Sequence, residues 1–379
     1  LALTLVNAAL IKHRRMYPDM ERPFRVPFVP VLPALGIVAN LALLAQITQH
    51  HTPFQLALGS LFLGVVGFWA WKGTRPEEKE MPGGESRVAL ERASISRPGQ
   101  FRVLVPIANP ASIDAFIDLA ASVAKERDGE ILALRVVTVP EQVSPRLEHS
   151  LIQKQAEILE RARSRGRELG VPVTTLVVVG YNVARAILET THGRHCNLVV
   201  LGWKGYTSTA RRILGEITDT IVSQAKADII VVKQVGQEPL RRFFLPTVGG
   251  EHARLAEDYT ASLARAQGGT MTIGRIIRSD SSEEVRQQAV ETLDKAVERL
   301  QDMGDLQKRL LESEDIVECI VREGQSHDAI VIGASGRSSY RQLLLGNIPE
   351  QVVRKSRKTV LIVKRHNPVK ALVARVMTS

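Results

Sequence analysis

The chain has 379 residues, of which 44% are hydrophobic, 24% charged and 4% aromatic, with a formal net charge of +10 and two cysteines. This apolar content excludes a wholly disordered chain, and two cysteines are too few for a disulfide scaffold. Cys196 and Cys319 have no CxxC partner, which is typical of reduced cytosolic thiols. Because the chain begins at Leu1 inside an apolar run, we expect it to be a piece of a longer protein.

Residues 1–72 are predicted to form transmembrane helices. The first apolar run, Leu1–Ile11, is too short to cross a bilayer and is interpreted as the end of a helix. Val29–Ile47 has 19 residues without a charge and reaches about 28 Å as a helix, close to the hydrocarbon thickness. Phe54–Trp71 is similar. Buried core helices are the alternative interpretation of both long runs.

The basic residues between the first two runs predict the orientation in the membrane. The turn at residues 48–53 has no Lys or Arg, so we place it outside and the basic loop inside. The chain then re-enters the cytoplasm, and everything after about Lys72 is predicted to be cytoplasmic in a multi-pass cell-membrane protein. Membrane lipid is an expected partner, because lipid phosphates attract these side chains. The loop carries Lys12, Arg14, Arg15, Arg22 and Arg25.

The same loop reads Arg-Pro-Phe-Arg-Val-Pro over Arg22–Pro27, with Pro30, Pro33 and Gly36 following. Each proline disfavours helix at the residue before it, so we expect an extended segment along the membrane surface. The loop resembles one between late helices of amino-acid permeases of the amino acid–polyamine–organocation superfamily. The resemblance implies a transporter whose remainder lies upstream of Leu1 and whose substrate site is not in this chain. An unrelated basic interfacial loop is the alternative.

Residues 73–100 are rich in Pro, Gly and Glu and predict a flexible linker, with a short helix over Arg87–Arg92 as a weak alternative. After the linker, one pattern occurs twice, in a domain over 101–236 and another over 241–366. A tail, 367–379, follows and has a short apolar pattern that fits docking to a domain or to the bilayer.

Both copies alternate Val/Ile/Leu-rich strands with amphipathic helices, which predicts an α/β fold with two tandem Rossmann-like domains and parallel sheets. Only five positions separate Gly324 from Ala329, against eighteen between Gly180 and Leu198, so the last crossover helix of the second copy is predicted to be missing. Two such copies can pack as a pseudo-dimer. Predicted strands are 101–107, 131–137, 173–179, 198–201 and 229–232 in the first copy, and 243–248, 270–277, 316–321, 329–332 and 360–363 in the second.

The fourth strand of each copy leads into glycines with the same spacing, G-x2-G-x9-G, and a helix follows. Glycine lets backbone N–H groups approach a phosphate at the carboxyl ends of parallel strands and at a helix N-terminus. The alternative is that these glycines only shape the loop and permit close helix–strand packing. The candidate residues are Gly202, Gly205 and Gly215 in the first copy, and Gly333, Gly336, Arg337, Ser338, Gly346 and Asn347 in the second.

This pattern resembles the universal stress protein family, whose ATP-binding members carry Ser or Thr after the last glycine and an Asp after the first strand. The resemblance implies ATP or another adenine nucleotide as the ligand. In this chain the Asp positions are Ala108 and Val248, and the Ser/Thr positions are Glu216 and Asn347. Glu216 puts a negative charge where phosphate would bind. The second copy is therefore the better candidate, and we expect weak or no ATP binding at the first.

No enzyme is predicted, because the chain has no G-x-S-x-G, Walker lysine or HExxH motif. His192, His195 and Cys196 are one ligand short of a structural zinc site, so no metal is expected. The basic residues are mixed with acids and lack an aromatic platform, so nucleic acid is not an expected partner.

Two functions follow from these observations. The first is the carboxyl-terminal portion of an amino-acid permease-like transporter with a cytoplasmic regulatory region that binds a nucleotide. The second is a dimerisation or interaction module, with a homodimer as its product and no ligand.

Overall fold

A computed structural model describes residues 7, 34–40, 60, 62–63, 86–93, 99–138, 145–203, 215–236, 238–334 and 345–366. In the helix that begins at Pro145, side chains are described from residue 149 onward. The chain forms two units, one containing residues 1–79 and the other residues 80–371. The universal-stress-protein-like pattern lies wholly in the second unit.

The first unit is helical wherever it is described. Residues 34–40 form a helix inside the predicted run Val29–Ile47, and the Asn40 side-chain amide donates to the Gly36 carbonyl at 2.8 Å. None of the helices in the described ranges combines the length and apolar character needed to cross a membrane. Most of the three apolar runs, the basic loop, residues 73–85 and the tail 367–379 lie outside the described residues.

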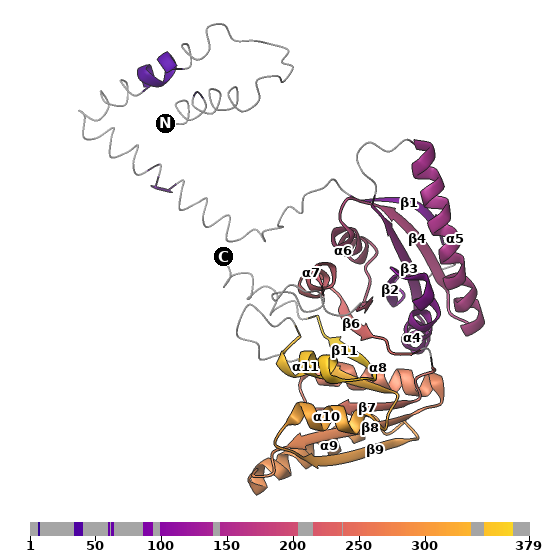
Figure 1. Cartoon of the computed structure of the whole chain (residues 1–379), viewed down its shortest axis with the longest axis vertical. Helices are drawn as coiled ribbons and strands as arrows, with labels where there is room; N and C mark the ends of the chain where they lie inside the picture. The colour runs from indigo at the N-terminus through magenta and orange to yellow at the C-terminus, as the bar shows by residue number, and fades with distance from the viewer. Residues whose placement is uncertain are drawn as a thin grey trace. The chain divides into compact units, whose positions relative to one another are not determined.

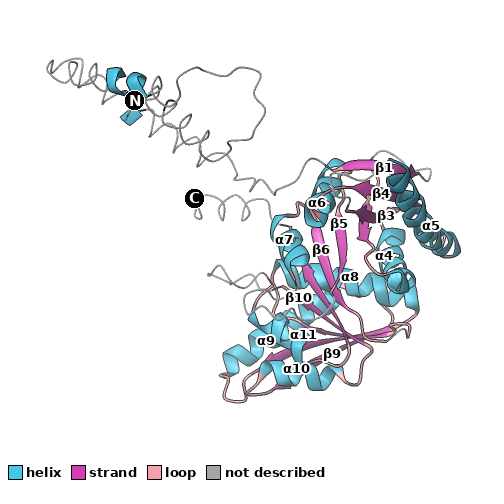
Figure 2. Cartoon of the chain, turned by 45° about the horizontal axis from the view of Figure 1, so that its top comes forward, coloured by secondary structure: helices cyan, strands magenta, loops and turns pink. Residues whose placement is uncertain are grey.

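The second unit is built on one eleven-stranded sheet with the order β1-β4-β3-β2-β5-β6-β11-β10-β7-β8-β9 (Figures 1 and 2). Val, Ile and Leu dominate the central strands because both faces of the sheet are covered by helices. The strands are β1 (Arg87–Arg92), β2 (Arg102–Pro106), β3 (Glu130–Val137), β4 (Val173–Val179), β5 (Leu198–Gly202), β6 (Asp228–Lys233), β7 (Arg242–Pro246), β8 (Thr270–Ile277), β9 (Leu306–Glu312), β10 (Ala329–Gly333) and β11 (Thr359–Lys364).

The sheet contains two halves with the same internal order. Strands β2–β6 form repeat 1 and strands β7–β11 form repeat 2, and all pairings within each repeat are parallel. The repeats join where β6 pairs antiparallel with β11, from Val360 opposite Lys233 to Lys364 opposite Ile229. The expected pseudo-dimer therefore forms within one chain, and its two parallel sheets are fused into a single sheet.

Helices cover the sheet in two layers that are each shared by both repeats. One buried cluster includes residues of α4, α5, α8 and α9, and the other includes residues of α6, α7, α10 and α11. The helices are α4 (Ile113–Glu126), α5 (Pro145–Leu169), α6 (Val183–Gly193), α7 (Glu216–Gln224), α8 (Glu251–Gln267), α9 (Glu283–Arg299), α10 (Ile316–Gly324) and α11 (Asn347–Lys355).

The predicted linker 73–100 is wrong in its second half. Arg87–Arg92 is a strand rather than a helix or a tether, and it pairs antiparallel with β4. Its apolar residues are at most half-buried: Ala89 and Leu90 are partly covered, whereas Val88 is 49% exposed, and the register shifts between Val88 and Leu90. The Ser86 N–H adds a bond to Glu189 of α6 at 3.1 Å. Strand β1 thus covers the outer edge of repeat 1.

The topology predicted for the end of repeat 2 is also wrong. Residues 316–321 belong to helix α10, whose Asp315 cap accepts the Glu318 N–H at 3.0 Å, and the third strand is Leu306–Glu312. The crossover helix is present. The chain is shortened earlier, because Leu306 follows Thr270 by 36 positions whereas Val173 follows Glu130 by 43. Strand β9 was missed because its outer position gives it mostly exposed, charged side chains.

Candidate functional site

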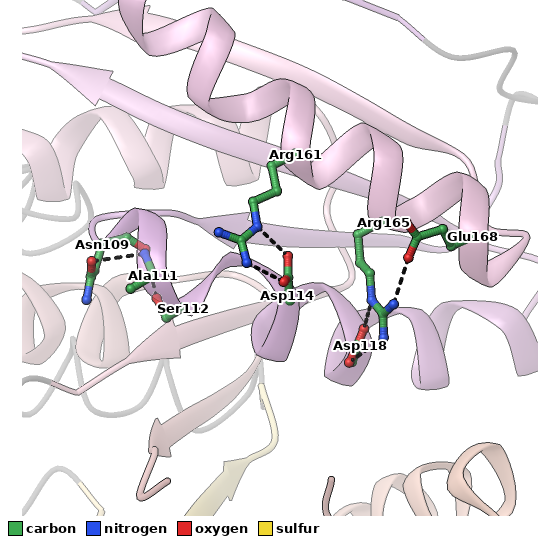
Figure 3. Close-up of polar contacts among 8 residues, drawn as sticks. All are labelled: Asn109, Ala111, Ser112, Asp114, Asp118, Arg161, Arg165 and Glu168. Carbon is green, nitrogen blue, oxygen red and sulfur yellow. Dashed lines mark hydrogen bonds and ion pairs between the residues drawn. The ribbon is translucent and has the colours of Figure 1, made fainter. Parts of the chain in front are cut away.

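The carboxyl ends of β2 and β5 form the candidate edge in repeat 1. Ala108 and Asn109 follow β2 and are both exposed. The Asn109 side-chain oxygen accepts the Ala111 N–H at 3.1 Å and begins a 3-10 turn over Pro110–Ser112 (Figure 3). Asn109 is thus part of a helix-starting turn, and neither position after β2 supplies a carboxylate.

Two bidentate ion pairs hold α5 against α4 beside this edge (Figure 3). Arg161 Nε lies 2.9 Å from Asp114 Oδ1, and Arg165 Nε lies 2.6 Å from Asp118 Oδ1. Arg165 also donates to Glu168 at 2.7 Å. Exposed pairs of this kind contribute little to the free energy of unfolding. Their main effect is to fix the angle between the two helices. Because Arg161 and Arg165 are paired with acids, their charges are not left free to bind a nucleic acid.

Repeat 2 builds the corresponding edge around a buried threonine. The Thr247 hydroxyl donates to Glu257 Oε1 at 2.9 Å and accepts the Gly249 N–H at 3.3 Å. The Thr247 carbonyl oxygen accepts from Arg275 Nη1, also at 3.3 Å. Val248, at the position where the resemblance implies an aspartate, is 74% exposed. Side chains from two other elements therefore fix this turn, while its apolar residue faces outward.

Glu257 was not singled out from the sequence, although it is among the most buried charged groups at this edge. Its side chain is 1% exposed, and it forms an ion pair with Arg299 of α9. The sequence does indicate that Glu257 is buried, because it lies on the apolar stripe of α8 together with Ala253 and Ala261. An acid on such a stripe requires a buried partner.

The first glycine of each motif is explained by packing. A Cβ atom on Gly333 would lie 2.9 Å from the Ala253 nitrogen and from the His252 carbonyl carbon and oxygen, all in the backbone of α8. A Cβ atom on Gly202 would lie 3.0 Å from Cζ of the Phe116 ring. A helix backbone cannot move aside locally, whereas a phenyl ring can shift.

This difference predicts unequal costs for the same substitution in the two repeats. We expect Gly333→Ala to lower the free energy of unfolding by about 2–3 kcal/mol and Gly202→Ala by about 1 kcal/mol or less. Urea unfolding of the full chain, followed by circular dichroism, measures both. Equal costs would show that α8 relaxes as easily as the Phe116 ring.

The last glycine of each motif is required by backbone conformation. Gly215 and Gly346 are the N-caps of α7 and α11, with φ of 100° and 97° and ψ near 155°. This region of conformational space is essentially restricted to glycine. The residues that follow are exposed, and the Asn347 side-chain oxygen accepts the Gln351 amide at 2.8 Å. Gly205, Gly336, Arg337 and Ser338 lie outside the described residues.

A buried carboxyl group lies in the first turn of α11 and was not predicted. Glu350 is 8% exposed, and its Oε1 has no hydrogen-bond partner. Burial raises the pKa of Glu350 to about 7, and the negative charge of Asp219 on α7 adds to this, against the opposing effect of Arg354. Asp219 and Glu350 are each the fourth residue of their helix. The glycine spacing predicts that a helix follows each motif, but it does not indicate that Glu350 is buried.

The two lysines that end β6 and β11 tie the repeats together. Lys233 Nζ donates to the carbonyl oxygens of Val353 and Ser356 at the end of α11, at 2.8 and 2.7 Å. Lys364 Nζ donates to the carbonyl oxygen of Val222 in α7 at 2.6 Å. Each repeat thus supplies a cation to the C-terminal end of a helix in the other, where the helix dipole favours it.

The two cysteines are held in the interior, whereas His192 and His195 are exposed. Cys196 is buried, and burial raises the pKa of its thiol to about 12. Cys319 is also buried, in helix α10 rather than in the strand predicted there. Among the described residues, no group of three or more His, Cys, Asp and Glu side chains is placed to hold a metal ion.

The antiporter NhaS5 of Synechocystis, a Na(+)/H(+) antiporter, is 21% identical to this chain over 257 residues, which are 67% of this chain and 37% of the antiporter. The universal stress protein MJ0531 of Methanocaldococcus jannaschii is 29% identical over 126 residues, or 31% of this chain and 74% of that protein. The chain therefore spans little more than a third of the antiporter's length.

A universal stress protein from Archaeoglobus fulgidus matches the fold with a TM-score of 0.51 and 16% identity, covering 70% of this chain and 97% of that protein. The family model described as "Universal stress protein family" matches residues 101–233 and again residues 239–364. The two matches correspond to repeats 1 and 2. The chain therefore belongs to the universal stress protein family and carries two of its domains in tandem.

Proposed function

We propose that this chain is the regulatory portion of a multi-pass membrane transporter, and that repeat 2 binds an adenine nucleotide in the cytoplasm without catalysing a reaction. The tandem domains and their similarity to an antiporter support the general proposal. The observation that carries it is the glycine motif of repeat 2, which leads from β10 to the N-terminus of α11 with Gly346 as its cap. Unpaired N–H groups at such a terminus attract anions.

The transported substrate has two candidates. The proline-rich basic loop over Arg22–Pro27 favours an amino-acid permease of the amino acid–polyamine–organocation superfamily. Similarity to NhaS5 favours a Na+/H+ antiporter. In vesicles that contain the whole transporter, uptake of labelled amino acids supports the permease, whereas a Na+-driven change in internal pH supports the antiporter.

The nucleotide proposal predicts that only one repeat binds. We expect ATP to bind the full chain in equilibrium dialysis, and Gly336→Asp to weaken binding at least tenfold because it adds a negative charge to the phosphate loop. The matched change Gly205→Asp in repeat 1 is expected to have no effect, since Glu216 already opposes phosphate there. Binding that survives Gly336→Asp would overturn the assignment to repeat 2.

The alternative, an interaction module without a ligand, is favoured by a different observation. Packing and backbone conformation already explain four of the six motif glycines without a ligand. The β6–β11 pairing also places the two repeats against each other inside one chain. A concentration-dependent increase in mass without an ATP-dependent change in melting temperature supports this alternative.

A further inference from the structure

The second strand of each repeat carries a half-buried arginine at the same position. Arg135 is the sixth residue of β3, and Arg275 is the sixth residue of β8. One guanidinium nitrogen of each, Nη1 of Arg135 and Nε of Arg275, is buried without a hydrogen-bond partner. The repetition places an incompletely paired cation near the carboxyl end of both second strands.

Neither arginine has an ion pair within the described part of the chain. Burial lowers the pKa of both guanidinium groups, with no acidic side chain acting in the opposite direction. By contrast, Arg278, three residues after Arg275, pairs with Asp280 at 3.0 Å and with Glu314 at 3.1 Å. Acids are therefore available at the end of β8, but none of the described ones is paired with Arg275.

The surroundings of Arg275 are defined most completely. Its Nη1 donates to the Thr247 carbonyl oxygen, which sets the guanidinium against the turn that follows β7. Glu257 of α8, the buried carboxylate that contacts this turn, is engaged by the Thr247 hydroxyl and by Arg299.

We propose that Arg275 anchors an oxyanion, a carboxylate or phosphate group of a small ligand, at the carboxyl edge of repeat 2, and that Arg135 does the same in repeat 1. A guanidinium has five N–H donors in a planar fork that matches both groups. This proposal rests on the small-ligand function above and adds a second anchor for negative charge, at the second strand, in addition to the glycine loop.

Inorganic phosphate and succinate are suitable probes, because neither contains a nucleoside. We expect each to raise the melting temperature of the full chain by a few degrees at constant ionic strength, relative to chloride. A larger shift with phosphate identifies phosphate as the preferred group, and a larger shift with succinate identifies carboxylate.

Substitutions assign the shift to one arginine. Arg275→Met is expected to abolish the part of the shift due to repeat 2, and Arg275→Met combined with Arg135→Met is expected to abolish all of it. The matched control Arg278→Met keeps the shift. ATP dialysis with Gly336→Asp reports on the glycine loop separately, so a failure of the glycine-loop proposal is distinguishable from a failure of this one.

A second measurement covers the case in which a variant is poorly folded. Without an added anion, Arg275→Met is expected to melt a few degrees higher than the parent, because an incompletely paired cation is replaced by an apolar chain of similar length. A lower melting temperature for Arg275→Met, or anion shifts equal to those of the parent, would show that Arg275 only covers apolar surface and would overturn the proposal.

Discussion

Replacing Arg299 with methionine is expected to lower the free energy of unfolding by about 3 kcal/mol, because it leaves the buried Glu257 carboxylate without its cation. Glu257 is 1% exposed, and its partners within the described residues are Arg299 and the Thr247 hydroxyl. Removing Arg299 leaves a buried carboxylate with one neutral hydrogen bond. Water cannot reach that carboxylate well enough to replace the lost cation.

Urea unfolding of the full chain at pH 7 measures this effect. The control is Lys295→Met, which removes a neighbouring pair on α9, Lys295 with Glu291, whose side chains are 70% and 63% exposed. That change is expected to cost under about 0.5 kcal/mol. Similar costs for Arg299 and Lys295 would contradict the idea that the Glu257 pair is desolvated.

A double substitution separates the value of the pair from the cost of breaking it. Glu257→Leu together with Arg299→Met removes both charges and is expected to recover most of the stability lost in Arg299→Met. The Thr247 hydroxyl would keep the Gly249 N–H as a partner. If the double variant is as unstable as the single one, the ion pair itself, rather than an orphaned charge, stabilises α8 against α9.

The repeated fold could be predicted from the sequence because its information is local. Val173–Val179 is a continuous run of β-branched and aliphatic residues, and Thr270–Ile277 is largely apolar apart from Gly274 and Arg275; the structure places strands at both. The predictions for two elements were wrong because their local composition fits both a helix and a strand. Strand β9 has the charged character of an outer strand, and α10 begins with an apolar run that also fits a strand. The pairing of β9 with β8, which links residues far apart in the sequence, decides which segment is the strand.

The candidate site was predictable to a smaller extent. Glycine spacing located the strand exits and the N-caps Gly215 and Gly346, because those positions need conformations open only to glycine. The charged groups behind the site were not predictable in the same way. Whether Glu350 is buried depends on how the repeats pack, and no spacing rule in the sequence encodes that packing.

Glu350→Gln is expected to stabilise the chain by about 3 kcal/mol at pH 8. In the unfolded chain Glu350 has an ordinary pKa of 4.5, and in the fold its pKa is about 7. Between these values the folded state holds a proton that the unfolded state has released, so stability falls as the pH rises from about 4.5 to 7. Glutamine has the same shape and never ionises, so it removes this loss.

Urea unfolding at pH 5 and pH 8 tests the expectation, because the advantage of Glu350→Gln should shrink to roughly 1 kcal/mol at pH 5. Asp219→Asn provides the comparison. It removes the charge that repels an ionised Glu350 but leaves the carboxyl group buried, so it should stabilise the chain at pH 8 by less than Glu350→Gln does.

If Glu350→Gln is less stable than the parent at pH 8, the ionised carboxylate must be stabilised by its contacts. If Asp219→Asn matches it, repulsion between the two repeats, rather than burial, sets the pKa of Glu350.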